Sequence, residues 1–187
     1  MAIQSNASTE EVVGGIKTFS GLTNVKVIAI NPTMEELHAL DIKVKQEPVY
    51  TGIDLGSGEC NKVVFWVRNS DGNFKLEILM QPTPRTSQTG KYQWMNNIGQ
   101  ATWSEEVYGG EETLINFTKA WANVASGDEV SYETMNAIVN GDVTEIKALA
   151  DTVLNNNEVR VLIGVKDDKY QQIYTKYFGR VKPQRDD

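Results

Sequence analysis

The sequence has 187 residues and a mass of 20.8 kDa, enough for one sizeable domain with a real hydrophobic core. Its single cysteine, Cys60, excludes an internal disulfide and any zinc site built from a cysteine cluster. The polar, acidic N-terminus lacks the apolar run of a signal peptide, and no stretch approaches membrane-spanning length. We therefore expect a soluble intracellular protein.

The net charge of −7 argues at first sight against a nucleic-acid partner, because proteins that bind polyanions usually carry a basic surface. The charge is unevenly distributed along the chain. Residues 105–157 carry ten acidic and two basic side chains, whereas residues 61–104 carry five basic and two acidic ones, and residues 158–185 carry seven and three. The segments with strand character are therefore basic, and the acidic excess lies in the segment with helical character.

The first part of the chain alternates loops with short elements. Residues 1–20 have no hydrophobic periodicity and are predicted to form a flexible N-terminal arm. VKVIAI (25–30) predicts a buried strand, and NPTMEELHAL (31–40) predicts a brief amphipathic helix after it. The glycine-rich stretch TGIDLGSGEC (51–60) predicts a loop.

A hairpin gives the strongest local signal. KVVFWVRN (62–69), the turn SDGN and FKLEILMQ (74–81) have the pattern of strand, turn and strand. The proline, serine and threonine of PTPRTSQTG (82–90) predict a loop, and KYQWMNNIGQATW (91–103) predicts a further strand pair.

The hydrophobic period becomes helical after residue 109. GGEETLINFTKAWANVA (109–125) has one apolar stripe and predicts a helix with acidic residues in its first turn. Shorter helices are predicted near 131–139 and 143–154, the latter with a capping box formed by Asp142 and Glu145.

A second hairpin closes the chain, with strands in EVRVLIGVKDD (158–168) and KYQQIYTKYF (169–178). Three strands, a helical excursion and two strands is the element order of an OB-fold. We therefore predict an α+β, mainly β protein: an OB-fold-like barrel over residues 21–183, with a helical insertion at 105–157 between the third and fourth core strands and a short acidic end at 184–187. Another α+β sheet with the same element order is the alternative.

Catalytic motifs are scarce in the sequence. The only histidine, His38, lies in a predicted helix, so a Ser-His-Asp or Cys-His arrangement could form only around that position. GSGECNK (56–62) lacks the second glycine of a phosphate-binding loop. Acidic pairs such as Glu111-Glu112 are typical of helix starts and solvated turns, although they leave a carboxylate-only metal site open. We expect no enzymatic activity, no cofactor and no metal.

Two predicted strands carry an unusual mixture of rings and cations on one face. Alternation in KVVFWVRN puts three such residues together: Lys62, Trp66 and Arg68. Alternation in KYQQIYTKYFGRVK (169–182) puts five together: Tyr170, Tyr174, Lys176, Phe178 and Arg180. The opposite faces are predicted to line a core: Val63, Phe65 and Val67, and Ile173, Tyr177 and Val181. Flat rings on which bases stack, with cations along the backbone path, are what single-stranded nucleic acid needs.

Four further residues could extend this predicted interface: Arg85, Lys91, Tyr92 and Trp94. The alternative is that the rings are ordinary strand residues packed under the helices, because aromatic residues are favoured in strands. A register slip of one residue would exchange the faces of Tyr177 and Phe178.

Four runs of the sequence resemble the single-stranded DNA-binding proteins encoded in the replication modules of large tailed phages: VKVIAINPTMEEL, KYQWMNNIGQATW, GGEETLINFTKAW and VRVLIGVKDDKYQQIYTKYFGR. The resemblance spans residues 20–182 and implies an OB-type fold that coats single-stranded DNA during replication and recombination. The positions it implies for the binding face are Trp66, Arg68, Tyr170, Tyr174, Lys176, Phe178 and Arg180. Such proteins commonly end in a long acidic tail that recruits partners, whereas this sequence ends in QRDD, so the acidic helical block would have to replace the tail.

The resemblance implies single-stranded DNA as the partner, with RNA left open, replication proteins as further partners, no membrane, and the cytoplasm of an infected bacterial host. A virion structural protein, such as a capsid decoration or tail-associated subunit, is the alternative. Such proteins are also acidic, cysteine-poor, β-rich and free of catalytic motifs. A structural subunit should bury the rings in an apolar interface and scatter the cations elsewhere.

Overall fold

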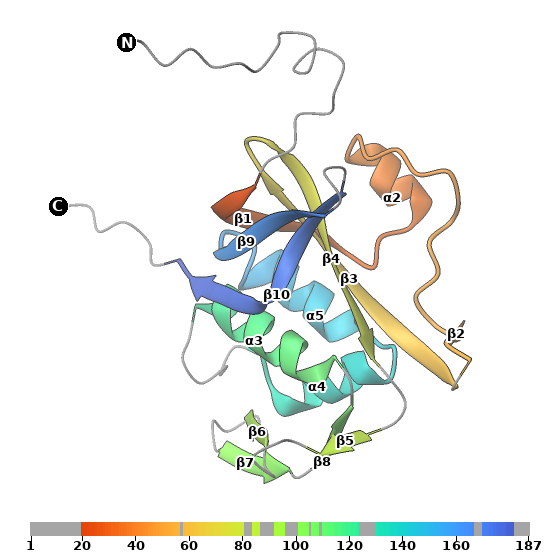
Figure 1. The fold of residues 1–187 in the computed structure, drawn as a ribbon, viewed down its shortest axis with the longest axis vertical. Helices are drawn as coiled ribbons and strands as arrows, with labels where there is room; N and C mark the ends of the chain where they lie inside the picture. Colours follow the sequence, from red (N-terminus) through yellow and green to blue (C-terminus); the bar gives the residue numbers. More distant parts are fainter. Residues whose placement is uncertain are drawn as a thin grey trace, which may run out of the picture.

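The computed structural model describes residues 20–56, 58–80, 84–86, 92–95, 101–104, 106–108, 110–123, 130–166 and 170–181. For the short strands between residues 84 and 108, and for Tyr132, Lys166 and Tyr170, it describes the backbone alone. The protein is α+β and mainly β, as predicted (Figure 1).

Six strands form one antiparallel sheet: β1 (Gly21–Ile30), β2 (Ile53–Asp54), β3 (Glu59–Asn69), β4 (Gly72–Met80), β9 (Glu158–Lys166) and β10 (Tyr170–Arg180). Their order is β10-β9-β1-β3-β2, and β4 also pairs with β3. Both predicted hairpins, β3 with β4 and β9 with β10, are confirmed. The sheet curls into a half-barrel, and β10 comes into contact with β4 across its open side (Figure 1).

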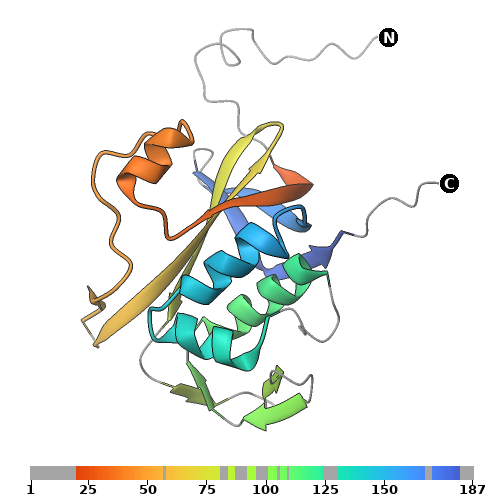
Figure 2. The same ribbon diagram turned by 180° about the vertical axis from the view of Figure 1, so that it is seen from behind.

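Three helices cover the inner face of this sheet: α3 (Glu111–Ala122), α4 (Tyr132–Val139) and α5 (Thr144–Thr152). Figure 2 shows them side by side in front of the strands, while α2 (Met34–Ala39) lies apart from them. As predicted, the helical block lies between β4 and β9 in the chain. No helix in the described part of the chain is long and apolar enough to span a membrane.

An aromatic cluster joins the helices to the sheet. The Phe117 ring of α3 lies 4.7 Å from the ring of Phe65 on β3, 6.0 Å from Trp121 and 5.3 Å from Phe178 on β10, measured between centroids. The predicted apolar stripe of α3 is therefore the core side of that helix, with Leu114, Phe117 and Trp121 fully buried.

The helix starts show which capping predictions hold. Thr33 accepts from the backbone N–H of Glu36 and Glu36 accepts from that of Thr33, so α2 begins with a capping box. The capping box predicted for Asp142 and Glu145 is wrong. Asp142 precedes the N-cap by one residue and accepts from Thr144 N, while Glu145 accepts from Thr134 Oγ1 on α4 and so ties two helices together.

Two small strand pairs lie outside the main sheet: β5 (Pro84–Thr86) with β8 (Glu106–Tyr108), and β6 (Tyr92–Met95) with β7 (Ala101–Ser104). The second pair confirms the strand pair predicted in 91–103. The loop predicted for 82–90 is wrong at 84–86, because β5 pairs with a segment about twenty residues further along the chain that no local pattern indicates.

Candidate nucleic-acid interface

The outer face of the sheet, defined as the face turned away from α3, α4 and α5, carries the first predicted set of residues. Val63, Phe65 and Val67 of β3 point inward and are no more than 1% exposed. Alternation therefore puts Lys62, Trp66 and Arg68 on the outer face, as predicted. Trp66 is half-buried, and Arg68 is exposed.

Strand β4 adds two charged residues to this face. Trp66 pairs with Lys75 across the ladder, and Lys75 Nζ lies 5.9 Å from the centroid of the Trp66 ring, within cation–π range. Glu77 lies between two lysines, with its carboxylate oxygens 3.4 Å from Lys62 Nζ and 3.2 Å from Lys75 Nζ. Neither residue was among those predicted for the interface, although alternation in FKLEILMQ puts both on the face opposite to Leu76 and Ile78.

The carboxylate of Glu77 is ionised at neutral pH. Burial by itself would raise the pKa of Glu77, but Lys62 and Lys75 outweigh burial and hold that pKa below its ordinary value of 4.5. The ion pairs therefore stabilise the fold above the ordinary pKa, and this contribution is lost as the pH falls through the lowered value. One anion thus partly neutralises two of the cations around Trp66.

Arg68 is held in place by two hydrogen bonds. Its Nε donates to Asn73 Oδ1 at 2.7 Å, and its Nη2 donates to the Leu40 carbonyl at the end of α2 at 2.9 Å. Lys26 of β1 is its cross-strand neighbour, so two cations lie side by side on the outer face. A hollow of about 530 Å³ opens beside them, lined by Thr23, Asn24, Lys26, Ile28, Arg68, Asn69, Ser70 and Glu158.

The second predicted set, on β10, is divided between the two faces. Tyr174 and Lys176 are exposed, in agreement with the prediction. Arg180 is exposed too, but it pairs with the buried Val159 two residues after Phe178, so the prediction that it shares the face of Tyr174 is wrong. The prediction that Phe178 shares this open face is wrong, because its ring packs against the core, edge-on to Phe117. Tyr177, predicted to line the core, is 39% exposed instead.

A bulge explains this exchange of faces. Ile173 pairs with Ile163 and Phe178 pairs with Val161, so β10 advances five residues while β9 advances two. The excess of three residues is odd, and it inverts the alternation after the bulge, which brings Ile173 and Phe178 to the same inner face.

The remaining predicted residues are described less fully. Arg85 lies on β5, Tyr92 and Trp94 lie on β6, and Tyr170 begins β10, each with its backbone alone described. Lys91 lies outside the described residues. His38, the only histidine, is exposed on α2, as expected for an ordinary helix residue.

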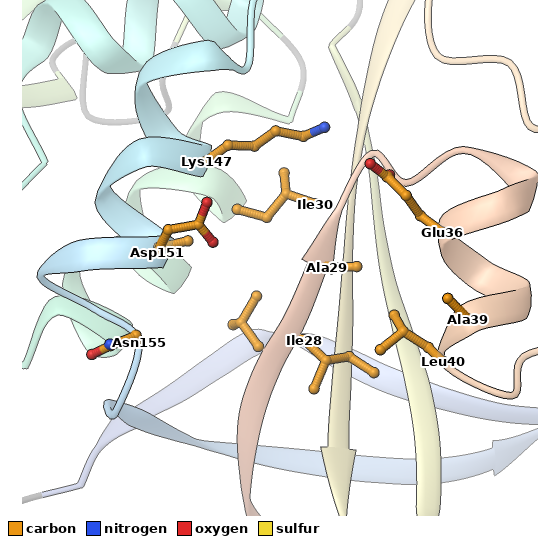
Figure 3. Close-up of a pocket in the computed structure, with 11 residues that line it drawn as sticks. Ile28, Ala29, Ile30, Glu36, Ala39, Leu40, Lys147, Asp151 and Asn155 are labelled. Atoms are coloured by element: carbon orange, nitrogen blue, oxygen red, sulfur yellow. The ribbon is translucent and has the colours of Figure 1, made fainter.

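A different hollow of about 460 Å³ lies where β1 passes between α2 and α5. Figure 3 shows Glu36 and Leu40 on one side, Lys147 and Asp151 on the other, and the end of β1 between them. Aliphatic side chains form most of its wall, no ring lines it, and two of its three charges are acidic, which suits a polyanion poorly. Within the described ranges, no group of three His, Cys, Asp or Glu residues could hold a metal ion.

The fold and the outer face of the sheet define the class of this protein. It is an α+β, mainly β protein whose curled antiparallel sheet carries an aromatic ring among cations on its outer face. Comparison of the chain with protein-family models, with curated proteins and with solved structures finds no match. Its function is therefore inferred from its own residues.

Proposed function

We propose that the protein binds single-stranded DNA and coats it during phage DNA replication and recombination. One observation carries the proposal: the Trp66 ring lies on the outer face with Lys62, Arg68 and Lys75 around it. Base stacking on such a ring is worth about 1–3 kcal/mol per base and tolerates any sequence. The cations supply the phosphate contacts that give most of the affinity.

The proposal includes an OB-type barrel. Following the sheet from β4 through β3, β1 and β9 to β10 gives the strand order of a five-stranded Greek-key barrel, and the contact between β10 and β4 lies where that barrel would close. In OB-folds the second and third strands carry the oligonucleotide. Their counterparts are β3 and β4, which carry Trp66 and Lys75.

Strand β10 is proposed to add further contacts. Tyr174 is 50% exposed and offers a second flat surface, and Lys176 and Arg180 are exposed cations on the same strand. Phe178 does not belong to the proposed interface, because its ring packs against the core, edge-on to Phe117. Five residues stay in the proposal from the sequence pattern: Arg85, Lys91, Tyr92, Trp94 and Tyr170.

Binding to oligo-dT and to a duplex of equal length tests the proposed function. We expect tighter binding to oligo-dT, measured by fluorescence anisotropy, with an affinity that falls steeply as salt rises because binding releases condensed counterions. Equal affinity for the duplex, or no binding at low salt, would contradict the proposal and favour a virion structural role.

The variant Glu77→Gln is expected to bind oligo-dT more tightly than the wild type. The substitution removes the anion that neutralises Lys62 and Lys75 and that repels phosphate. Exposed ion pairs are worth less than about 1 kcal/mol, so the expected gain is about threefold, together with a steeper salt dependence. Glu112→Gln on the exposed side of α3 is the matched control and should leave affinity unchanged. Unchanged or weaker binding by Glu77→Gln would show that Glu77 does not lie close to the bound phosphates.

A further inference from the structure

The ring of Tyr177 lies against a glycine on the outer face of β10. A Cβ atom built at Gly179 would be 2.8 Å from Tyr177 Oη and 3.4 Å from its Cζ. Gly179 pairs with Arg160 of β9, and the same Cβ atom would be 3.1 Å from the Arg160 Cβ. The missing side chain of Gly179 therefore makes room for the end of the Tyr177 ring beside Arg160.

Arg160 connects this ring to the rest of the outer face. It pairs with Asn24 of β1, and its Nε donates to Asn24 Oδ1 at 3.1 Å. Asn24 also lines the hollow beside Lys26 and Arg68. The guanidinium is thus directed from Tyr177 toward that hollow.

The hollow lies between the two rings. Arg68 is two residues from Trp66 on the same face of β3, and Asn24 adjoins Arg160. Strand spacings of about 4.8 Å and rises of about 3.3 Å per residue put Trp66 about 20 Å from Tyr177 across the sheet. Lys26, Arg68 and Arg160 lie along this line, and Glu158 is the one acidic residue among those lining the hollow.

We propose that Tyr177 and Arg160 form a second subsite for single-stranded nucleic acid, in which Tyr177 stacks on a base and Arg160 binds a phosphate, with the hollow connecting it to Trp66. This proposal rests on the proposed function and extends it. A short oligonucleotide on Trp66 does not reach Tyr177, whereas a longer one occupies both subsites. The contribution of Tyr177 should therefore depend on oligonucleotide length.

The test measures binding of a thymidine dinucleotide, which is too short to join the two rings, and of oligo-dT of about 16 nucleotides, the upper end of the site-size range for one barrel of this class. Tyr177→Ala is expected to weaken binding of the longer oligonucleotide about tenfold and that of the shorter one less than twofold. Tyr177→Phe keeps the ring and should bind like the wild type. Gly179→Ala should displace the ring and reproduce the loss seen with Tyr177→Ala.

Arg160→Ala tests the phosphate contact independently. For the longer oligonucleotide alone, the slope of log affinity against log salt concentration should be lower by about one, because one phosphate contact is lost. Val153→Ala, which alters an exposed side chain on the helical side, is the control and should change neither affinity. If the wild type binds neither oligonucleotide, the proposed function itself fails. If the wild type binds both and Tyr177→Ala and Arg160→Ala match it at both lengths, the second subsite is overturned while the proposed function stands.

Discussion

Replacing Trp66 with alanine is expected to weaken binding of oligo-dT by about 1–3 kcal/mol, or roughly 5- to 150-fold. The Trp66 ring is half-buried on the outer face, next to Lys75 Nζ. The substitution removes this ring and with it the flat surface on which we propose that a base stacks. Trp66 does not belong to the core cluster of the described residues, and the variant should stay folded. Fluorescence anisotropy over a range of salt concentrations measures the effect, and the salt slope should change little because no cation is removed.

Lys75→Ala is the matched control for this prediction, since it alters the residue paired with Trp66 and removes a charge instead of a ring. Its loss of affinity should appear as a salt slope lower by about one. Unchanged affinity of Trp66→Ala, in a variant shown to be folded, would mean that Trp66 only packs against its neighbours and would remove the observation on which the proposed function depends.

The face of Trp66 was predictable from the sequence because β3 is regular. It pairs with β4 without interruption from Asn61 to Asn69, so strict alternation holds along the strand. Local patterns also identified α3 by its apolar stripe and the turn of the first hairpin, since each depends on neighbouring residues alone.

The faces of Tyr177 and Phe178 were not predictable by the same argument. A bulge in β10 brings Phe178 to the inner face, where its ring packs against Phe117 on α3, and the sequence of β10 alone does not contain that contact. Long-range contacts set other features too. The hydrogen bond from Arg68 to the Leu40 carbonyl joins residues 28 positions apart, and that from Arg160 to Asn24 joins residues 136 positions apart.

Replacing Phe178 with alanine is expected to lower the free energy of unfolding by about 3 kcal/mol, because the ring packs against the core and its removal leaves a cavity beside Phe117. Urea denaturation measures this loss. Tyr177→Ala, one residue earlier and 39% exposed, is the matched comparison and should cost about 1 kcal/mol or less.

The same two variants should differ in DNA affinity in the opposite order to their stability. Phe178→Ala should keep its affinity per folded molecule, since its ring faces α3, whereas Tyr177→Ala should lose affinity for the longer oligonucleotide. A Phe178→Ala protein as stable as the wild type but weak in DNA binding would show the opposite: that Phe178 lies on the outer face and stacks on bases. The strict alternation predicted from KYQQIYTKYFGRVK would then hold through the bulge, and the assignment of Tyr177 to the second subsite would be wrong.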